Sequence, residues 1–190
     1  CLNLKYEEVI ELVRKKLYDY HPDKVRRVWI PKPGKSEKRP LGIPTISDRI
    51  VQECVRRILE PIAEGQFFEH SYGFRPMRSA DMAVARIKAI NFTAKCYWVV
   101  EGDIKGFFDN IDHNVMIESL WQIGIRDKRI LSIIKQMLKA GVMDECETSE
   151  LGTPQGGNLS PLLSNIMLNE LDKELEIRGL NFVRYADDCL

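Results

Sequence analysis

The chain has 190 residues, 44% of them hydrophobic, and its 28 basic residues balance its 28 acidic ones. This is enough for a buried core in one domain or two small lobes. No apolar stretch approaches the ~18 residues of a membrane-spanning helix, so we expect no membrane partner. The five cysteines are widely spaced and form no C-x-x-C pair, which argues against a disulfide framework or structural zinc and favours a cytoplasmic protein.

The first elements predicted are a helix and a basic hairpin. Residues 5–19 place apolar side chains at helical spacing, and residues 25–30 alternate as a strand does. Residues 31–40 are rich in proline, glycine and charge, which predicts a projecting loop before a second strand at 41–44. The basic residues gathered here are Lys24, Arg26, Arg27, Lys32, Lys35, Lys38 and Arg39. Such a run suits phosphates, although most charged runs are ordinary solvated surface.

The middle of the chain predicts helices and one strand that ends on an acid. Residues 48–67 and 81–90 have helical patterns, whereas residues 97–100 are β-rich and lead to Asp103. A carboxylate at the end of a half-buried strand must be hydrated, paired or metal-bound, and we expect Asp103 to be a metal ligand. Asp109 and Asp112 precede an apolar helical segment, where helix capping is their expected role.

Residues 152–179 combine a turn with a long helix. Ser160 and Pro161 mark a helix start, and Gly179 is placed to end it. Before that helix, Gln155 offers a donor and an acceptor, while Gly156 and the glycine after it allow a sugar or base to approach the backbone. Most Gly-Gly pairs are simple turns, so this signal alone is weak.

The last ten residues, NFVRYADDCL, contain a β-rich run and two adjacent acids, Asp187 and Asp188. They predict the first half of a hairpin with acids at its tip; taken alone, an Asp-Asp pair in a turn is more often solvated than functional. Combined with Asp103, the turn at Gln155 and the basic hairpin, the three acids suit two Mg²⁺ ions and a nucleoside triphosphate.

The sequence resembles the reverse transcriptases encoded by group II introns. Five blocks carry the match in order: KRPLGIPTISDRIVQ (38–52), HSYGFRPMRSADMAV (70–84), GDIKGFFDNIDH (102–113), GTPQGGNLSPLLSNIMLNELD (152–172) and RYADD (184–188). Tyr-Ala-Asp-Asp and Thr-Pro-Gln-Gly-Gly point to group II introns and their bacterial relatives rather than to retroviral enzymes. Small departures, such as Met77 where the family often has glycine and Asp81-Met82 where His-Asp is common, lie away from the acids.

The resemblance implies a role for individual residues. Asp103, Asp187 and Asp188 match the catalytic aspartates that hold two Mg²⁺ ions, for which Mn²⁺ can substitute, and the carbonyl of Ile104 assists. Phe108 matches the steric gate against a 2′-hydroxyl, although a plain core role for it stays open. Residues implied to bind the dNTP are Lys32, Lys38, Arg39, Phe108, Gln155 and Gly156. Residues expected to contact nucleic acid are Arg26, Arg27, Lys35 and Arg75.

The implied fold is α+β, a right hand with an antiparallel palm sheet backed by helices. Fingers would comprise residues 1–92, including the basic hairpin at 25–44, and the helical residues 113–150. Palm would comprise residues 93–112 and 151–190. Because the chain starts at Cys1 and stops two residues after Asp188, we expect a piece of a longer protein without its thumb. Such a fragment should extend primers weakly, leave Asp187 and Asp188 mobile and metal-free, and self-associate as a homodimer through bare apolar surface.

The implied activity is RNA-directed DNA synthesis on an RNA template and DNA primer. The implied partner is the group II intron RNA, which a maturase grips during splicing, in a nucleoid-associated ribonucleoprotein of the bacterial cytoplasm. Three alternatives remain open at this point. The chain could be chiefly an RNA-binding splicing factor, a reverse transcriptase of a retron, diversity-generating or CRISPR-associated element, or another palm enzyme such as a nucleotidyl cyclase.

Overall fold

The structure is a computed structural model that describes residues 5–31, 34, 36, 38–96, 98–140 and 156–190. The N-terminal elements are α1 (Tyr6–Tyr18), β1 (Arg26–Pro31), β2 (Lys38–Ile43), α2 (Ile46–Glu64) and α3 (Ala80–Ala94). They are followed by β3 (Gly102–Asp103), the short 3₁₀ helix η1 (Phe107–Asp109), α4 (His113–Gln122), α5 (Lys128–Leu138), α6 (Ser160–Ile177), β4 (Arg184–Tyr185) and β5 (Asp188–Cys189). None of the helices in the described ranges is long and apolar enough to cross a membrane.

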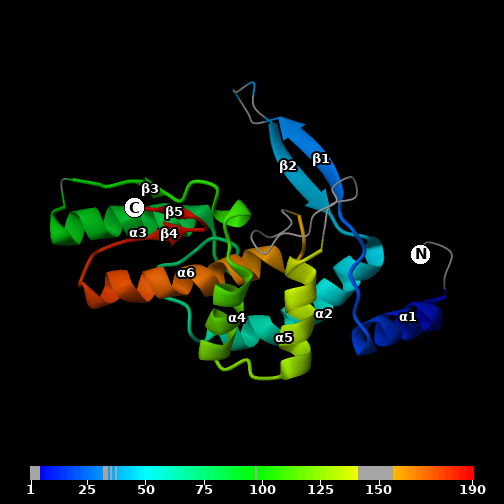
Figure 1. Ribbon diagram of the computed structural model, residues 1–190. Helices are drawn as coiled ribbons and strands as arrows, with labels where there is room; N and C mark the ends of the chain where they lie inside the picture. Colours follow the sequence, from blue (N-terminus) through cyan, green and yellow to red (C-terminus); the bar gives the residue numbers. More distant parts are fainter. Residues whose placement is uncertain (1–4, 32–33, 35, 37, 97, 141–155) are drawn as a thin grey trace.

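The predicted basic hairpin is present and projects from the body of the protein (Figure 1). β1 and β2 pair antiparallel from Arg26 opposite Ile43 to Pro31 opposite Lys38. An isolated two-stranded hairpin is only marginally stable in water, so its base must be anchored. Val25, just before β1, and Pro44, just after β2, are both buried and provide this anchor.

A buried carboxylate joins α1 to the start of α2. Asp48 is 2% exposed and pairs with the ammonium of Lys16 at 2.8 Å. The hydroxyls of Tyr20 and Thr45 donate to the same carboxylate at 3.1 and 2.7 Å, and the backbone amide of Asp23 donates to it at 3.1 Å. A buried charge is tolerated when it is paired and hydrogen-bonded in this way. The cluster therefore fixes the N-terminal helix against the core.

The hydrophobic core lies among α2, α4, α5 and α6. Side chains that are at most 2% exposed at its centre include Val51, Leu59, Ile111, Met116, Leu120, Ile134, Leu163 and Ile166. Helices α4 and α5 each have an aspartate as their N-cap residue. The carboxylate of Asp112 accepts hydrogen bonds from the backbone amides of Asn114 and Val115 at 2.8 and 3.1 Å. Asp127 caps α5 in the same way. These amides lower the pKa of Asp112, and the predicted capping role of Asp112 is confirmed.

The expected strand before Asp103 is much shorter than its β-rich sequence suggests. Among the described residues of 95–103, only Gly102 and Asp103 pair with a neighbouring strand, and Trp98 and Val100 are 92% and 83% exposed. β3 has a two-residue partner, so the preceding residues have no ladder to join within the described chain. By contrast α3 continues to Ala94, beyond the predicted end at residue 90. The mixed helix and sheet architecture agrees with the predicted α+β class.

Candidate active site

The three predicted acids lie at one end of a small antiparallel sheet. The strand order is β3-β5-β4, and Asp103 on β3 lies directly opposite Asp188 on β5. Asp187 occupies the two-residue turn between β4 and β5, next to Ala186. Side chains directly opposite each other in antiparallel strands have Cβ atoms about 4.5–5.5 Å apart. The fold thus brings together two segments separated by more than eighty positions in the sequence.

The returning strand of this hairpin is complete enough to pair. The backbone amide and carbonyl of Leu190 exchange hydrogen bonds with Val183 at 3.0 and 2.9 Å. β5 also pairs with β3 on its other side. Asp188 therefore lies in the central strand of the sheet, which disagrees with our expectation that this acid would be mobile. Its position in a ladder bonded on both sides is the physical reason.

Mutual repulsion among acids marks this end of the sheet. Partial burial raises the pKa of Asp188, and the negative charges of Asp187, Asp103 and Glu101 raise it further. A divalent cation is the natural counter-charge, since Mg²⁺ prefers hard carboxylate and carbonyl oxygens. The donor set fits such an ion. In the described part of the chain, however, no three His, Cys, Asp or Glu side chains are yet gathered closely enough to hold a metal.

The loop after Asp103 contains the other candidates of this region. The carbonyl of Ile104 accepts the amide of Phe107 at 3.2 Å, which leaves one of its two lone pairs for another partner. Phe107 is buried in the core, whereas Phe108 is half-buried and meets it edge-on, with ring centroids 5.6 Å apart. Phe108 also packs against the core beside Phe107, so both the core role and the steric-gate role predicted for it stay open.

The turn that leads into α6 packs against the hairpin. Gly156 has a φ of 124°, and a Cβ on it would lie 2.9 Å from the carbonyl oxygen of Gly42 and 3.0 Å from the side chain of Leu41. Two residues further on, the backbone amide of Asn158 donates to the side-chain oxygen of Gln52 at 2.8 Å. This turn therefore bridges β2 and α2. The predicted nucleotide contact Gln155 lies outside the described residues.

The basic candidates divide into two groups. Arg26, Arg27 and Lys38 are exposed on the hairpin, where Arg27 lies over the ring of Trp29 at 5.9 Å. Lys32, Lys35 and the side chain of Arg39 lie outside the described residues.

Arg75 is different from the exposed hairpin residues, because its side chain is only 3% exposed. Its guanidinium pairs with Glu64 at 2.9 Å and donates to the carbonyls of Phe68 and Ser71 at 2.7 and 3.0 Å. These contacts occupy its donors inside the protein. The structure therefore favours an internal structural role for Arg75 over the nucleic-acid contact that we expected from its charge.

Comparison with known proteins places this geometry in a family. A family profile described as "Reverse transcriptase (RNA-dependent DNA polymerase)" matches residues 30–190. The chain belongs to the reverse transcriptase family. It is 48% identical over 171 residues to the group II intron-encoded protein LtrA of Lactococcus lactis subsp. cremoris, covering 88% of this chain and 28% of LtrA. It is 42% identical over 168 residues to the protein YkfC of Escherichia coli K12, covering 85% of this chain and 43% of YkfC.

A solved structure shares the fold along nearly the whole chain. A chain of a partial Cas6-RT-Cas1–Cas2 complex superposes with a TM-score of 0.57 and 28% identity, covering 98% of this chain and 33% of that one. The expected α+β fold and the resemblance to group II intron reverse transcriptases are therefore confirmed. This reverse transcriptase chain spans about a quarter of the length of LtrA, so the activity and partners of a whole protein are matters for proposal.

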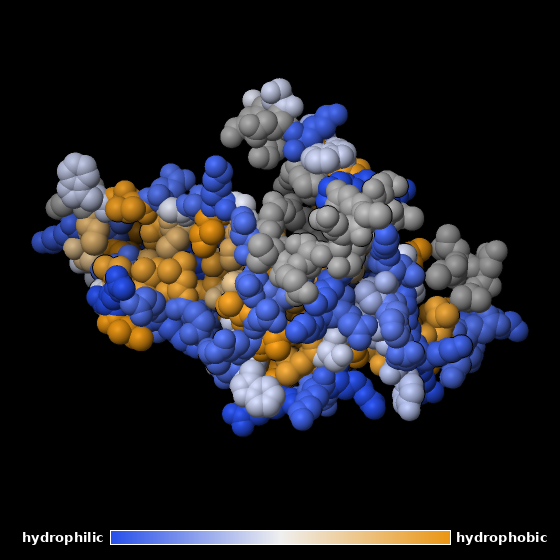
Figure 2. All heavy atoms as spheres, in the orientation of Figure 1, coloured by the Kyte–Doolittle hydropathy of each residue, from blue (hydrophilic) through white to orange (hydrophobic). Residues whose placement is uncertain are grey.

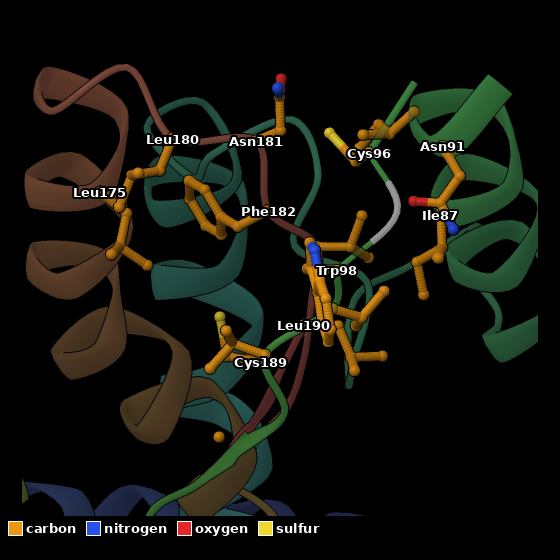
Figure 3. Close-up of a pocket in the computed structure, with 15 residues that line it drawn as sticks. Ile87, Asn91, Cys96, Trp98, Leu175, Leu180, Asn181, Phe182, Cys189 and Leu190 are labelled. Atoms are coloured by element: carbon orange, nitrogen blue, oxygen red, sulfur yellow. The ribbon is translucent and has the colours of Figure 1, made fainter. Parts of the chain in front are cut away.

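The palm sheet of this reverse transcriptase carries its acids on one face, and Cys189 with the buried Arg184 on the other. Side chains alternate along a strand, so Gly102 and Cys189 face away from Asp103 and Asp188. They line an apolar cavity of about 430 Å³ between the sheet, α3 and the end of α6, whose lining also includes Trp98 and Leu190 (Figure 3). The same end of the molecule shows a concentration of hydrophobic surface (Figure 2). A cavity of this lining does not suit a triphosphate.

A buried polar network that the sequence did not predict lies behind the acids. Its members are Gly73, Asn165, Asp172 and Arg184. The one available signal was an arginine inside an apolar strand, directly before the Tyr-Ala-Asp-Asp turn. Spacing alone could not find its partners, because Asn165 and Asp172 read as ordinary polar positions of a helix.

Proposed function

We propose that this chain is the fingers and part of the palm of an RNA-directed DNA polymerase of a mobile group II intron. The observation that carries the proposal is the register of the palm sheet, in which Asp103 faces Asp188 and Asp187 occupies the adjoining turn. Membership of the reverse transcriptase family and the similarity to LtrA support it. The proposed reaction adds a dNTP to a primer 3′-hydroxyl, with release of pyrophosphate.

In this mechanism Asp103, Asp187 and Asp188, assisted by the carbonyl of Ile104, would hold two Mg²⁺ ions. Bound there, such ions lower the pKa of the primer 3′-hydroxyl and stabilise the charge that develops on the triphosphate. The three carboxylates would offset most of the positive charge of the two ions before a nucleotide binds. Mn²⁺ offers the same oxygen-preferring chemistry and should substitute.

Nucleotide recognition in the proposal comes from the surrounding elements. Lys38 at the start of β2, with Lys32 and Arg39, would bind the triphosphate, since arginine suits paired phosphate oxygens. Phe108 would exclude a 2′-hydroxyl by its bulk. Gln155 and Gly156 would lie against the incoming sugar, because the turn that contains Gly156 packs on the hairpin. Fingers would then be residues 1–92 and 113–150, and palm residues 93–112 and 151–190.

Primer extension on an RNA template by the full-length protein tests this function. Asp103→Asn and Asp187→Asn should each reduce incorporation by at least about 100-fold, because each removes a charged ligand. Asp112→Asn is the matched control: it makes the same chemical change at a helix-capping acid outside the site, and asparagine caps a helix about as well as aspartate. Undiminished activity of Asp103→Asn would refute the assignment.

A maturase role is the second proposed function, and the exposed hairpin favours it. Arg26, Arg27 and Trp29 present positive charge and an aromatic ring that is 54% exposed, a combination that suits RNA backbone and bases. Asp187→Ala with Asp188→Ala should abolish nucleotide incorporation and leave intron RNA binding and splicing nearly intact. Arg26→Ala with Arg27→Ala should weaken RNA binding and make it less dependent on salt. Equal loss of splicing in the folded acid variant would show that the two functions are not separable.

A further inference from the structure

Arg184, two residues before the turn of acids, is completely buried in an ion pair. Its Nε and Nη2 atoms donate to the two carboxylate oxygens of Asp172 on α6 at 2.7 and 2.6 Å, and both side chains are 0% exposed. Burying such a pair costs so much desolvation that an apolar replacement is often equally stable. Its presence directly behind the candidate active site therefore calls for a role besides stability.

The remaining nitrogen of Arg184 reaches the turn itself. Nη1 donates to the carbonyl oxygen of Ala186 at 2.8 Å and to the side-chain oxygen of Asn165 at 2.9 Å. The carbonyl of Ala186 belongs to the planar peptide that leads into Asp187. Fixing this carbonyl fixes the plane of that peptide, and so the position from which the side chain of Asp187 starts.

The turn is held from its other side by the segment at residues 70–73. A Cβ on Gly73 would lie 2.2 Å from the backbone nitrogen of Ala186, so only glycine allows this approach. The side-chain amide nitrogen of Asn165 donates to the carbonyl of Gly73 at 2.8 Å. Asn165 therefore connects Arg184 on one side of the turn to Gly73 on the other; we call these contacts around the turn the clamp. Between them Ala186 has a φ of 59°, a conformation that non-glycine residues adopt only when their surroundings impose it.

We propose that Arg184 is a positioning residue: oriented by Asp172 and Asn165, it holds the Ala186–Asp187 peptide so that the carboxylate of Asp187 is aimed at the divalent cation. The inference rests on the proposed polymerase function and deepens it. A purely structural ion pair would change the fraction of folded protein. A positioning residue changes the affinity for the cation and the rate of each folded molecule.

Arg184→Lys in the full-length protein is the first test. Lysine keeps a positive charge beside Asp172, but a single ammonium cannot reproduce the planar set of contacts that reaches Ala186. We expect the affinity for Mn²⁺, measured by titration calorimetry without nucleotide, to fall by about 10- to 100-fold, as for other groups that orient metal ligands. The single-turnover incorporation rate per active molecule should fall by a similar factor, while the affinity for primer and template is unchanged.

Gly73→Ala tests the same clamp without altering the guanidinium. The added methyl group must displace Ala186. We therefore expect the Mn²⁺ affinity and the single-turnover incorporation rate to fall as they do in Arg184→Lys. Gly65→Ala is the matched control, because a Cβ there meets nothing closer than a carbonyl oxygen at 3.7 Å and its φ of −67° suits alanine. Should Arg184→Lys not fold, Gly73→Ala and its control still decide the question.

The outcomes are distinct. If Arg184→Lys and Gly73→Ala bind Mn²⁺ and incorporate nucleotides at wild-type levels per active molecule, the proposal is overturned, even when both lower the active fraction. Failure of the polymerase function itself looks different, because the wild-type protein would then extend no primer or Asp187→Asn would keep its rate. In that case the Mn²⁺ affinities alone decide whether Arg184 positions the acids.

Discussion

Gly156→Ala is expected to separate the turn before α6 from the basic hairpin. The φ of 124° at this position lies in a region that is essentially restricted to glycine, and occupying it with another residue costs about 1–3 kcal/mol. The new Cβ would also be 2.9 Å from the carbonyl oxygen of Gly42 and 3.0 Å from Leu41. Overpacking of this kind costs about 1–3 kcal/mol more.

The control for this variant is Gly124→Ala. Gly124 has a similar left-handed φ of 96°, but nothing lies within 4 Å of the position of its Cβ. Gly124→Ala therefore incurs the backbone cost alone, and the difference between the two variants isolates the contact with the hairpin. We expect Gly156→Ala to lower the free energy of unfolding by about 2 kcal/mol more than the control.

Urea titration, monitored by circular dichroism, measures the free energy of unfolding of Gly156→Ala and of Gly124→Ala. In a chain of this size the difference corresponds to roughly 4–8 °C in melting temperature. In the full-length protein, Gly156→Ala should also raise the KM for dNTP, because the displaced turn and the hairpin bind the same nucleotide in our proposal. Equal destabilisation by the two variants would refute the argument that the turn is packed on β2.

Two further predictions concern the N-terminal half. Asp48→Ala should lower the free energy of unfolding by about 2 kcal/mol, because it leaves the buried hydroxyl of Tyr20 without its acceptor and removes one of the two carboxylates that pair with Lys16; Asp19→Ala, at a residue whose side chain is 80% exposed, is the control and should change it by less than about 0.5 kcal/mol. Burial, followed by the charge of Arg86, lowers the pKa of His70 below 6.5, so the unfolded chain takes up the proton first and stability falls as pH drops below about 6.5. His70→Gln should flatten this slope in thermal melts between pH 7 and 5, and an unchanged slope would contradict the assignment.

Local patterns predicted the local features of this protein. The hairpin and the capping role of Asp112 follow from residues within a few positions of one another, and both are present. The pairing of Asp103 with Asp188 joins distant segments, and no pattern in either segment specifies that register. Only the resemblance to a family indicated that these acids belong together, and that resemblance does not reveal which contacts hold them.

The sequence did not indicate which charged side chains would be buried. Arg75 and Arg27 carry the same group, and both were expected to contact nucleic acid. In the structure Arg75 is enclosed and paired with Glu64, whereas Arg27 is exposed on the hairpin. Asp172 likewise occupies a helix position that would suit a surface acid, yet it is 0% exposed because Arg184 neutralises it. The environment of each side chain, set by packing between distant elements, decides its role.

The palm sheet cannot maintain its own acidic edge. Its strands are two residues long, and the acids at that edge repel one another: burial first, and then the charges of Asp187, Asp103 and Glu101, raise the pKa of Asp188. Short strands contribute few ladder bonds to oppose this repulsion. The opposing contacts come instead from outside the sheet, through the hydrogen bonds of Arg184 to α6 and of its backbone to His70 and Tyr72. A neighbouring scaffold thus holds the acids in a repulsive arrangement, which a divalent cation would relieve on binding.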